Sequence, residues 1–418
     1  MRILFSTFGS LGDLHPYIAV ASEAKARGHQ PILATAAKYR AKIESLGLEF
    51  RPVRPDLPAE ADFGPLAKRV MDLKDGPRFL FQDVLSPALR DSYADLLAAS
   101  EDADVIITHP AALAGPLVAQ KLGKKWLSSV LAPISLWSKF DPPVPPTLPQ
   151  LDFLRALGPI WPTIMFTLGR RGTAPWVEEV EKLRREIGIP SLGHPMFEGQ
   201  FSPFGTLALF SRHFATPQRD WPVNTTATGF CFYDAQGYEN QKTEAWREWI
   251  EEGEPPIVFT LGSSAVFAAG DFYRLSASIA LDYDRRGLLL VGKETQNDPQ
   301  EQMPPEILSV DYAPHGEVFS RACLIVHQGG AGTTAQALRA GVPQIIVPFA
   351  HDQPDNAARL QRLGVGYSEK RRHYPGQAFE LFFDSPAFLT RNARHLGEKI
   401  RAENGPRAAC EAIERLLT

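Results

Sequence analysis

The stretch from Val326 to Phe349 constrains the fold more than any other part of the sequence. An apolar run from Cys323 to Val326 leads into three closely spaced glycines, and a helix of small residues follows before a second apolar strand. Such a strand, loop, helix, strand unit is typical of a doubly wound parallel sheet. The glycines let backbone N–H groups approach a ligand, and the two threonines after them place hydroxyls at the first helical turn. The stretch therefore predicts an anion site at a strand end, for which a phosphate is the natural ligand.

A second interpretation of the same stretch needs no ligand. Glycines also serve the geometry of any tight strand-to-helix turn, and threonines cap helices without binding anything. His327 stands at the end of the first strand, where its ring could donate an N–H to a second anionic oxygen. The loop alone does not decide between the two interpretations, so the flanking motifs matter.

Two flanking motifs favour the phosphate site. Tyr312-Ala313-Pro314-His315 precedes the loop, and His351-Asp352-Gln353-Pro354-Asp355-Asn356 follows the next strand. With these motifs the sequence resembles family 1 glycosyltransferases of the GT-B fold. The resemblance is closest to the bacterial branch, with vancomycin-class antibiotic glycosyltransferases, sterol glucosyltransferases and rhamnolipid-type rhamnosyltransferases. It implies an α/β fold of two Rossmann-like, doubly wound parallel-sheet domains that face a central cleft.

The resemblance also implies a site for a nucleotide-diphosphate sugar. In the family an aromatic residue stacks on the base, the histidine and glycine loop take the diphosphate, and an Asp-Gln pair, here Asp352 and Gln353, holds the sugar hydroxyls. Helix amides supply the positive field, so we expect a metal-independent enzyme without a cofactor. The other donor-binding residues implied are Gly262, Ser263, Ser264, Tyr312, Ala313, His315, His327, Gly329, Gly330, Ala331, Gly332, Thr333 and Thr334.

Length and composition bound the class of protein. At 418 residues the chain is long enough for two domains, and its net charge of −4 offers no broad basic field for nucleic acid. Three widely spaced cysteines argue against a disulfide framework or a zinc knuckle and are typical of a reducing compartment. No apolar run approaches the roughly 20 residues that a membrane-spanning helix needs. We therefore expect a cytoplasmic protein, for which peripheral contact with a membrane stays open.

Short β-branched runs alternate with amphipathic stretches in two series, the first beginning at Ile3 and the second at Pro256. A polar stretch separates the two series after Pro222. We expect an N-terminal acceptor-binding Rossmann-like domain at residues 1–222, a linker region at 223–254 and a C-terminal nucleotide-sugar-binding Rossmann-like domain at 255–390. The resemblance implies that a helical tail, 391–418, packs back toward the N-terminal domain.

Two residues compete for the role of catalytic base. An inverting sugar transfer needs a base for the acceptor hydroxyl and a positive field for the leaving diphosphate. Many family members carry a histidine base after the first strand, whereas this chain has Asp13 there and His109 where the partner aspartate would be. Either His109 is the base and Asp13 orients it, or Asp13 acts directly. Asp13 also fits a helix cap and His109 a strand-end histidine, and His15 is a further candidate.

Large apolar residues gather between Phe140 and Phe204 among prolines and glycines. Together with the segment around Phe79 they indicate an insertion around a pocket for an apolar acceptor. The alternative is that extra helices pack onto the first domain through these side chains. The candidate acceptor-binding residues are Phe79, Phe81, Trp137, Trp161 and Phe166.

The donor nucleotide stays open at this point, because the glutamate that many plant members use for the ribose is replaced by Ala335 followed by Gln336. We expect an inverting O-glycosyltransferase that moves a hexose from a UDP-glucose-type donor to a phenolic, flavonoid, sterol or lipid-like hydroxyl. A dTDP-rhamnose-dependent rhamnosyltransferase is the first alternative. A nucleotide-sugar epimerase of the same fold and a donor-binding protein without turnover are more remote alternatives.

Overall fold

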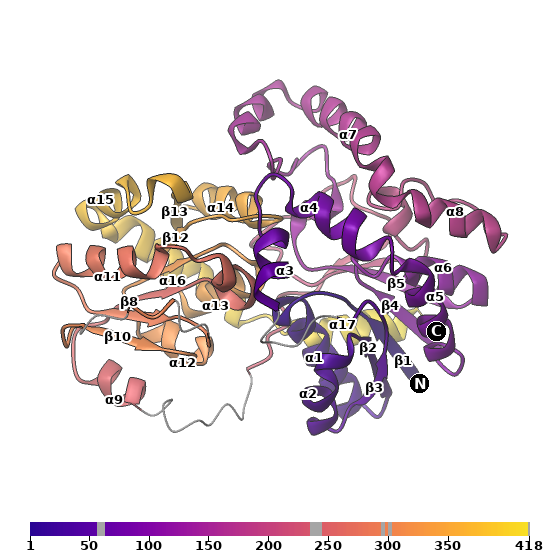
Figure 1. Ribbon diagram of the computed structural model, residues 1–418, viewed down its shortest axis with the longest axis horizontal. Helices are drawn as coiled ribbons and strands as arrows, with labels where there is room; N and C mark the ends of the chain where they lie inside the picture. Colours follow the sequence, from indigo (N-terminus) through magenta and orange to yellow (C-terminus); the bar gives the residue numbers. More distant parts are fainter. Residues whose placement is uncertain (57–62, 235–244, 294–296, 300–302, 417–418) are drawn as a thin grey trace. The chain divides into compact units, whose positions relative to one another are not determined.

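The structure is a computed structural model, which describes residues 1–418 except 57–62, 235–244, 294–296, 300–302 and 417–418 (Figure 1). The chain divides into two compact units, and each is described by itself. Unit 1 comprises Met1–Phe63, Lys74–Tyr233 and Glu403–Thr418, and unit 2 comprises Gly64–Leu73 and Asp234–Ala402. Of the expected tail at 391–418, the part up to Ala402 thus groups with unit 2 and the remainder with unit 1. Residues 235–244 of the expected linker lie outside the described residues.

Unit 1 is built on a seven-stranded sheet in which all strand pairs are parallel, with the strand order β3-β2-β1-β4-β5-β6-β7. Its strands are β1 (Arg2–Ser6), β2 (Gln30–Thr35), β3 (Glu49–Pro52), β4 (Val105–Thr108), β5 (Lys125–Val130), β6 (Thr206–Ala208) and β7 (Thr225–Ala227). In β1, Ile3 and Phe5 belong to one hydrophobic cluster and Leu4 to another. Because side chains alternate across a strand, both faces of the sheet are buried.

Helices cover both faces of this sheet. α1 and α17 pack together over the cluster of Ile3 and Phe5, whereas α5 and α6 belong to the cluster of Leu4. The longer helices are α1 (Leu11–Ala26), α5 (Leu89–Ala99), α6 (Ala114–Leu122), η5 (Pro149–Leu157), α7 (Ile160–Thr173), α8 (Glu178–Glu186) and α17 (Gly405–Arg415). The shorter ones are η1 (Ala37–Tyr39), α2 (Arg40–Ser45), α4 (Gly76–Arg78), η3 (Phe79–Leu85), η4 (Pro133–Leu136), η6 (Ala174–Val177) and η7 (Glu198–Gln200).

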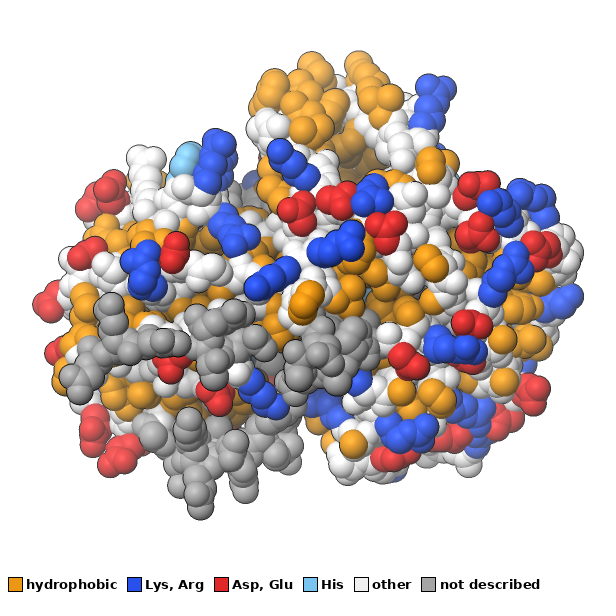
Figure 2. Space-filling model, viewed as in Figure 1, with side chains coloured by type: hydrophobic (Ala, Val, Ile, Leu, Met, Phe, Trp, Pro, Cys, Tyr) orange, Lys and Arg blue, Asp and Glu red, His pale blue; other side chains and the backbone are white. Residues whose placement is uncertain are grey.

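The segment of η5 and α7 differs from the other helices of unit 1, because it leaves large apolar side chains on the surface. Hydrophobic side chains gather over this part of the molecule in the space-filling view (Figure 2). No helix among the described residues is long and apolar enough to cross a membrane.

Unit 2 is built on a six-stranded parallel sheet with the strand order β10-β9-β8-β11-β12-β13. Its strands are β8 (Ile257–Thr260), β9 (Gly287–Leu290), β10 (Ile307–Val310), β11 (Leu324–His327), β12 (Gln344–Ile346) and β13 (Gly366–Ser368). Its helices are α3 (Phe63–Val70, from Gly64 onward), α9 (Ala245–Glu251), α10 (Gly262–Ala265), η9 (Val266–Ala268), α11 (Phe272–Asp282), α12 (His315–Val318), η11 (Phe319–Arg321), α13 (Ala331–Ala340), α14 (Gln353–Arg362), η12 (Arg371–His373), α15 (Gln377–Asp384) and α16 (Pro386–Arg401). In each unit the loops that follow parallel strands meet at one edge of the sheet, where ligands bind in such folds.

Candidate active site

In unit 1 the two candidate bases come from neighbouring strands. β1 and β4 pair in parallel with Ser6 aligned to Thr108, so the chain leaves both strands at the same edge of the sheet. Asp13 lies in the first turn of α1 after β1, and His109 directly follows β4. The structure brings them together, with Nε2 of His109 3.7 Å from Oδ1 of Asp13.

Asp13 is held at the start of α1 by a capping box. Ser10 is the N-cap, and its backbone N–H and hydroxyl donate to Oδ2 of Asp13 at 2.7 and 3.0 Å. A Cβ at Gly9, which has φ +138°, would lie 2.2 Å from the same Oδ2, so this turn requires glycine. Because Oδ2 is engaged by Ser10, the carboxylate presents Oδ1 toward His109. Both expectations for Asp13, a helix cap and a partner of His109, thus describe the same side chain.

The tautomer of His109 follows from its contacts. Its Nδ1 accepts a hydrogen bond from the backbone N–H of Ala111 at 3.2 Å, so in the neutral ring the proton sits on Nε2, which faces Asp13. Burial lowers the pKa of His109, and the carboxylate of Asp13 offsets only part of that shift. A neutral His109 of this tautomer directs its N–H toward Asp13, although 3.7 Å is too long for a hydrogen bond. Of the two residues, Asp13 is therefore the one with a lone pair that can accept the proton of a hydroxyl.

The surroundings of His109 fix its ring. Tyr17 packs edge-on with ring centroids 6.0 Å apart, and its hydroxyl lies 2.6 Å from the hydroxyl oxygen of Ser129, which donates to Thr108 O. A very small cavity beside His109 is also lined by Arg184 and Gln200. His15, the further candidate at the same turn, instead packs against Tyr233 with ring centroids 5.0 Å apart.

In unit 2 the glycine loop follows β11, which lies between β8 and β12. A Cβ at Gly329, with φ +89°, would lie 2.7 Å from Cγ2 of Ile346, so the turn requires glycine. Gly330 caps α13, and the first amide to bond within the helix is that of Thr334, to Gly330 O at 2.9 Å. The amides of Ala331, Gly332 and Thr333 thus precede the helical ladder, which is the arrangement that binds anions at helix N-termini. The contact with a diphosphate stays a prediction.

His327 is fully buried, and both its ring nitrogens are engaged inside unit 2. Nδ1 accepts from the backbone N–H of Gly329 at 3.0 Å, so Nε2 carries the proton and donates to Oε1 of Gln344 at 2.9 Å. Burial lowers the pKa of His327 to about 4, which keeps the ring neutral. The N–H that we expected to reach a phosphate oxygen is therefore directed to Gln344. In this structure the histidine holds the glycine loop against the sheet.

The residues of the expected sugar motif are linked to the same loop. Asn356 donates to Gly329 O at 2.8 Å and to Oδ2 of Asp352 at 2.7 Å. Oε1 of Gln353 accepts from the backbone N–H groups of Phe349 and Ala350 at 2.7 and 3.1 Å. Gln353 thus shapes the loop after β12 through its oxygen, and Asn356, to which we had given no role, connects Asp352 to the glycine loop.

The remaining expected donor residues border the ends of β8 and β10. Gly262 has φ +63° and donates to Oγ1 of Thr260 at 3.3 Å, and Ser263 and Ser264 follow it as exposed and half-buried residues. Tyr312 is half-buried and Ala313 buried. His315 opens α12 and stacks on Phe319 with ring centroids 4.4 Å apart.

Gln328 is a residue that the sequence did not single out. Its side chain is 6% exposed and lies between the two glycine loops, because a Cβ at Gly262 would be 2.4 Å, and one at Gly330 2.9 Å, from its Nε2. The signal available in the sequence was its position between His327 and the first glycine. Gln336 follows Ala335, which replaces the glutamate that many plant members use for the ribose. The side-chain amide of Gln336 donates to Asp234 at 3.2 Å, and Arg339 binds the same carboxylate.

Comparison with known proteins identifies the family. A model of the glycosyltransferase family 28 N-terminal domain matches residues 3–90, and one of the erythromycin biosynthesis protein CIII-like C-terminal domain matches residues 280–416. O-mycaminosyltylonolide 6-deoxyallosyltransferase of Streptomyces fradiae is 32% identical over 435 residues, which cover 99% of this chain and 97% of that protein. The chain is a family 1 glycosyltransferase. The expected family and enzyme class are thereby confirmed.

Two further similarities extend over the whole glycosyltransferase. Sterol 3-beta-glucosyltransferase of Leptosphaeria maculans is 29% identical over 438 residues, which cover 100% of this chain but only 29% of that protein. The solved structure of spinosyn rhamnosyltransferase SpnG complexed with thymidine diphosphate matches with a TM-score of 0.68 and 16% identity, covering 99% of this chain and 100% of that one. The predicted GT-B fold of two parallel-sheet, Rossmann-like domains is confirmed by such likeness in structure.

The five candidate acceptor residues of this glycosyltransferase differ in their exposure. Phe166 is 2% exposed and Phe79 6%, so both side chains serve mainly as packing. Trp137 is half-buried, stacks on Phe197 at 4.3 Å and meets Phe166 edge-on at 5.7 Å. Phe81 and Trp161 are half-buried as well. Acceptor contact stays a prediction for all five, and Phe81, Trp137 and Trp161 have more surface available for it.

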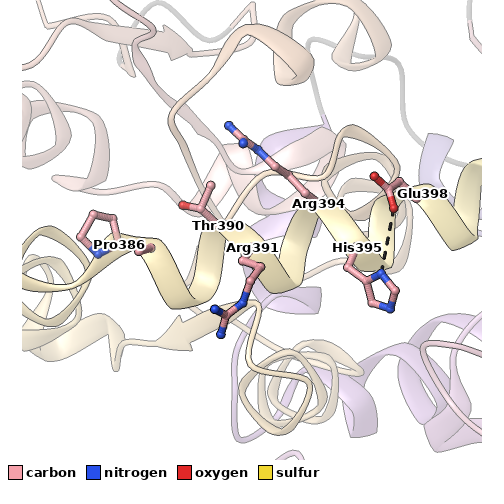
Figure 3. A pocket seen from close by; sticks show the side chains of 7 residues that line it. Pro386, Thr390, Arg391, Arg394, His395 and Glu398 are labelled. Carbon is pink, nitrogen blue, oxygen red and sulfur yellow. Dashed lines mark ion pairs between the residues drawn. The ribbon is translucent and has the colours of Figure 1, made fainter.

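A further hollow lies on the surface of unit 2. It is lined by Pro386, Ala387, Thr390, Arg391, Arg394, His395 and Glu398, which come from successive turns of α16 (Figure 3). His395 and Glu398 form an exposed ion pair 4.0 Å long. A shallow surface along one helix holds none of the expected donor or acceptor residues, and we assign it no part in the reaction.

Proposed function

We propose that this glycosyltransferase is an inverting O-glycosyltransferase that moves a hexose from a nucleotide-diphosphate sugar to a hydroxyl of an apolar small molecule. The observation that carries the proposal is the contact of Asp13 with the proton-bearing nitrogen of His109. Asp13 takes the proton of the acceptor hydroxyl as its oxygen attacks the anomeric carbon of the sugar. His109 directs its N–H toward Asp13 and stabilises the negative charge of the carboxylate.

The donor half of the proposal rests on unit 2. The bond between the anomeric carbon and the diphosphate breaks, and the leaving diphosphate is stabilised by the amides and dipole at the start of α13. Asp352 is the group that we propose for the sugar hydroxyls, with Asn356 fixing its orientation. Positive charge from a bound metal ion is not required where backbone amides supply the field.

Two donors compete in this proposal. UDP-glucose is the first candidate. A dTDP-6-deoxyhexose such as dTDP-rhamnose is the second candidate. It is favoured because the chain lacks the glutamate that many plant members use for the ribose hydroxyls, and Gln336 at this place is bonded to Asp234 instead. The names of a 6-deoxyallosyltransferase and of a rhamnosyltransferase complexed with thymidine diphosphate support the second candidate.

The acceptor class rests on the relatives and on the aromatic side chains of unit 1. Two relatives are named for an O-mycaminosyltylonolide and for sterols, and these names support an apolar acceptor that carries a hydroxyl. Phe81, Trp137 and Trp161 are the residues that we propose for contact with such an acceptor. A phenol, a macrolide and a sterol differ in shape, but each is an apolar molecule that carries a hydroxyl.

The experiment is a matrix of donors and acceptors with the purified full chain. UDP-glucose and dTDP-rhamnose are each incubated with a phenol, a macrolide aglycone, a sterol or no acceptor, and the release of nucleoside diphosphate is measured together with the glycoside formed. Product that carries a β-linkage from an α-linked donor supports inversion. Conversion of the donor to an epimeric nucleotide sugar without release of diphosphate would instead establish the epimerase alternative. Donor binding without any product in the whole matrix would favour a binding protein.

A further inference from the structure

Exposed apolar side chains are concentrated in one short segment of unit 1. Twelve large hydrophobic side chains are exposed among the described residues, and seven of them lie between residues 140 and 168. These seven are Phe140, Leu148, Phe153, Leu157, Ile160, Ile164 and Leu168. Scattered apolar side chains are normal on a protein surface, but a contiguous group marks an interaction site. We call the surface formed by η5 and α7 the apolar hairpin.

The helical spacing places part of this group on one stripe. Ile160, Ile164 and Leu168 are 67%, 49% and 61% exposed and follow one another at intervals of four residues, so they line one side of α7. The opposite side of the helix buries Pro162 and Phe166, and Phe166 packs against Trp137. Both sides of α7 are therefore apolar, but only one of them has a partner within unit 1. The space-filling view shows the resulting hydrophobic surface (Figure 2).

The charged side chains of the apolar hairpin flank an uncharged stretch. Residues 149–173 contain three arginines and one aspartate, a net charge of 3 − 1 = +2, against −4 for the full sequence. Residues 156–169 contain no charged side chain. Arg155 engages both Asp141 and Asp152, and Arg170 pairs with Glu198, whereas Arg171 is exposed at the end of α7. These ion pairs join two arginines to three carboxylates, so Arg171 is the cation that is left exposed at the end of the stripe.

An anionic lipid surface fits both properties. An exposed aliphatic stripe with a cationic residue at its end is typical of helices that lie in a membrane interface, with the apolar side chains among the lipid chains and the arginine, here Arg171, at the headgroups. We propose that the apolar hairpin docks this glycosyltransferase on the surface of an anionic lipid bilayer. The hairpin lies on the bilayer without crossing it, in keeping with the lengths of the described helices. The proposal goes beyond the proposed reaction and does not depend on which donor or acceptor is used.

Co-sedimentation with lipid vesicles tests the proposal on the full chain. Vesicles of phosphatidylcholine with one quarter phosphatidylglycerol are compared with vesicles of phosphatidylcholine alone, at low and high salt. We expect the wild type to bind the anionic vesicles more tightly, and high salt to weaken that binding. Ile160→Gln, Ile164→Gln and Leu168→Gln combined should lower the partition coefficient by roughly one hundredfold. Arg171→Gln should lower it about fivefold, and only for anionic vesicles.

Matched substitutions at other exposed apolar positions test whether the loss of vesicle binding is specific to the apolar hairpin. Leu281→Gln, Leu381→Gln and Phe388→Gln combined alter three apolar side chains of unit 2 that are 41%, 43% and 54% exposed, and should leave binding unchanged. All these positions are exposed, so thermal unfolding should show that both triple variants fold. Absence of vesicle binding by the wild type, or equal binding by the hairpin variant, would overturn the proposal. A dimer in sedimentation equilibrium that the hairpin variant dissociates, without vesicle binding, would assign the surface to a second copy of the chain instead.

Discussion

Nε2 of His109 lies 3.7 Å from Oδ1 of Asp13, and the backbone N–H of Ala111 occupies the other ring nitrogen of the histidine. The N–H of the neutral histidine therefore faces the carboxylate, at a distance longer than a hydrogen bond. A histidine base oriented by an aspartate also directs an N–H to the carboxylate, but its second ring nitrogen is free to take a proton, whereas here Ala111 N–H occupies that nitrogen. This difference decides how variants of the two residues should behave.

Asp13→Asn should lower turnover by two to four orders of magnitude, because it removes the base while keeping its shape. The asparagine oxygen can still accept from the backbone N–H of Ser10, so the free energy of unfolding should change by less than about 1 kcal/mol. Steady-state kinetics and denaturant unfolding measure the two quantities. Asn404→Ala is the matched control, since Asn404 caps α17 in the same unit through Arg407 N. It should cost about 1 kcal/mol of stability and leave turnover unchanged. Near-normal turnover of a folded Asp13→Asn protein would exclude Asp13 as the base.

His109→Ala should lower turnover by less than Asp13→Asn when each is made alone, because His109 positions and stabilises the carboxylate without taking the proton itself. In the double variant the losses should not add, since both residues belong to one unit. His109→Gln retains a hydrogen-bond donor and should recover part of the activity. A loss with His109→Ala as large as with Asp13→Asn, without any recovery by glutamine, would mean that the histidine is the base.

The proximity of Asp13 and His109 could be predicted from the sequence, because both residues follow apolar runs that are typical of parallel strands, whose ends meet at one edge. The partners of His327 could not. Its contact with Gln344 depends on the register between β11 and β12, which a run of Leu, Ile and Val residues does not specify. Gln328 was missed for a similar reason, because its place between two glycine loops depends on two strands that are far apart in the sequence.

The aromatic residues show a different limit of the sequence. Phe166 and Trp161 belong to one helix and have the same apolar character, yet only Phe166 is fully buried. Helical periodicity separates two sides of α7 but cannot say which one faces the protein when both are apolar. The apolar hairpin belongs to the region that we expected around an acceptor pocket, and four of its aliphatic side chains, Leu157, Ile160, Ile164 and Leu168, are exposed. Its contact with an acceptor stays a prediction.

Gly262→Ala should weaken donor binding by about tenfold or more. The new Cβ would lie 2.4 Å from Nε2 of Gln328, and φ +63° is unfavourable for alanine. Gly270→Ala is the matched control, because Gly270 has φ +58° but its nearest neighbour would be Nη2 of Arg371 at 3.5 Å. It should lose about 1 kcal/mol of stability and keep its affinity for the donor. Isothermal titration with the nucleoside diphosphate measures the affinity.

Gln328→Ala in the Gly262→Ala background tests the cause of that loss. If the clash between the two side chains is responsible, removing the amide of Gln328 should restore part of the affinity. Equal affinities for the Gly262→Ala and Gly270→Ala proteins would contradict the assignment of Gly262 to the donor site.

Chelation of divalent ions should leave turnover within about twofold, because the amides at the start of α13 supply the field for the leaving diphosphate. The assay compares initial rates with EDTA, and with added magnesium or manganese after EDTA. Abolition by EDTA with rescue by either ion would contradict the proposed source of positive charge.

The last prediction concerns stability at low pH. Burial lowers the pKa values of His327 and His315 to about 4 from an ordinary value of 6.5. Between these two values the unfolded state binds more protons than the folded state, so stability is complete above about pH 6.5 and falls as the pH drops toward 4. A shift of this size corresponds to about 3 kcal/mol for one histidine. Glu403, whose pKa is raised by burial, acts in the opposite sense, so the wild-type curve alone does not isolate the contribution of the histidines.

The free energy of unfolding should therefore be compared between the wild type and His327→Gln at about pH 7 and about pH 4.5. The variant should be less stable near neutral pH and should lose clearly less than the wild type on acidification. His395→Gln, at a position whose side chain is 66% exposed, should follow the wild-type curve. Parallel curves for wild type and His327→Gln would mean that His327 is protonated alike in the folded and unfolded states.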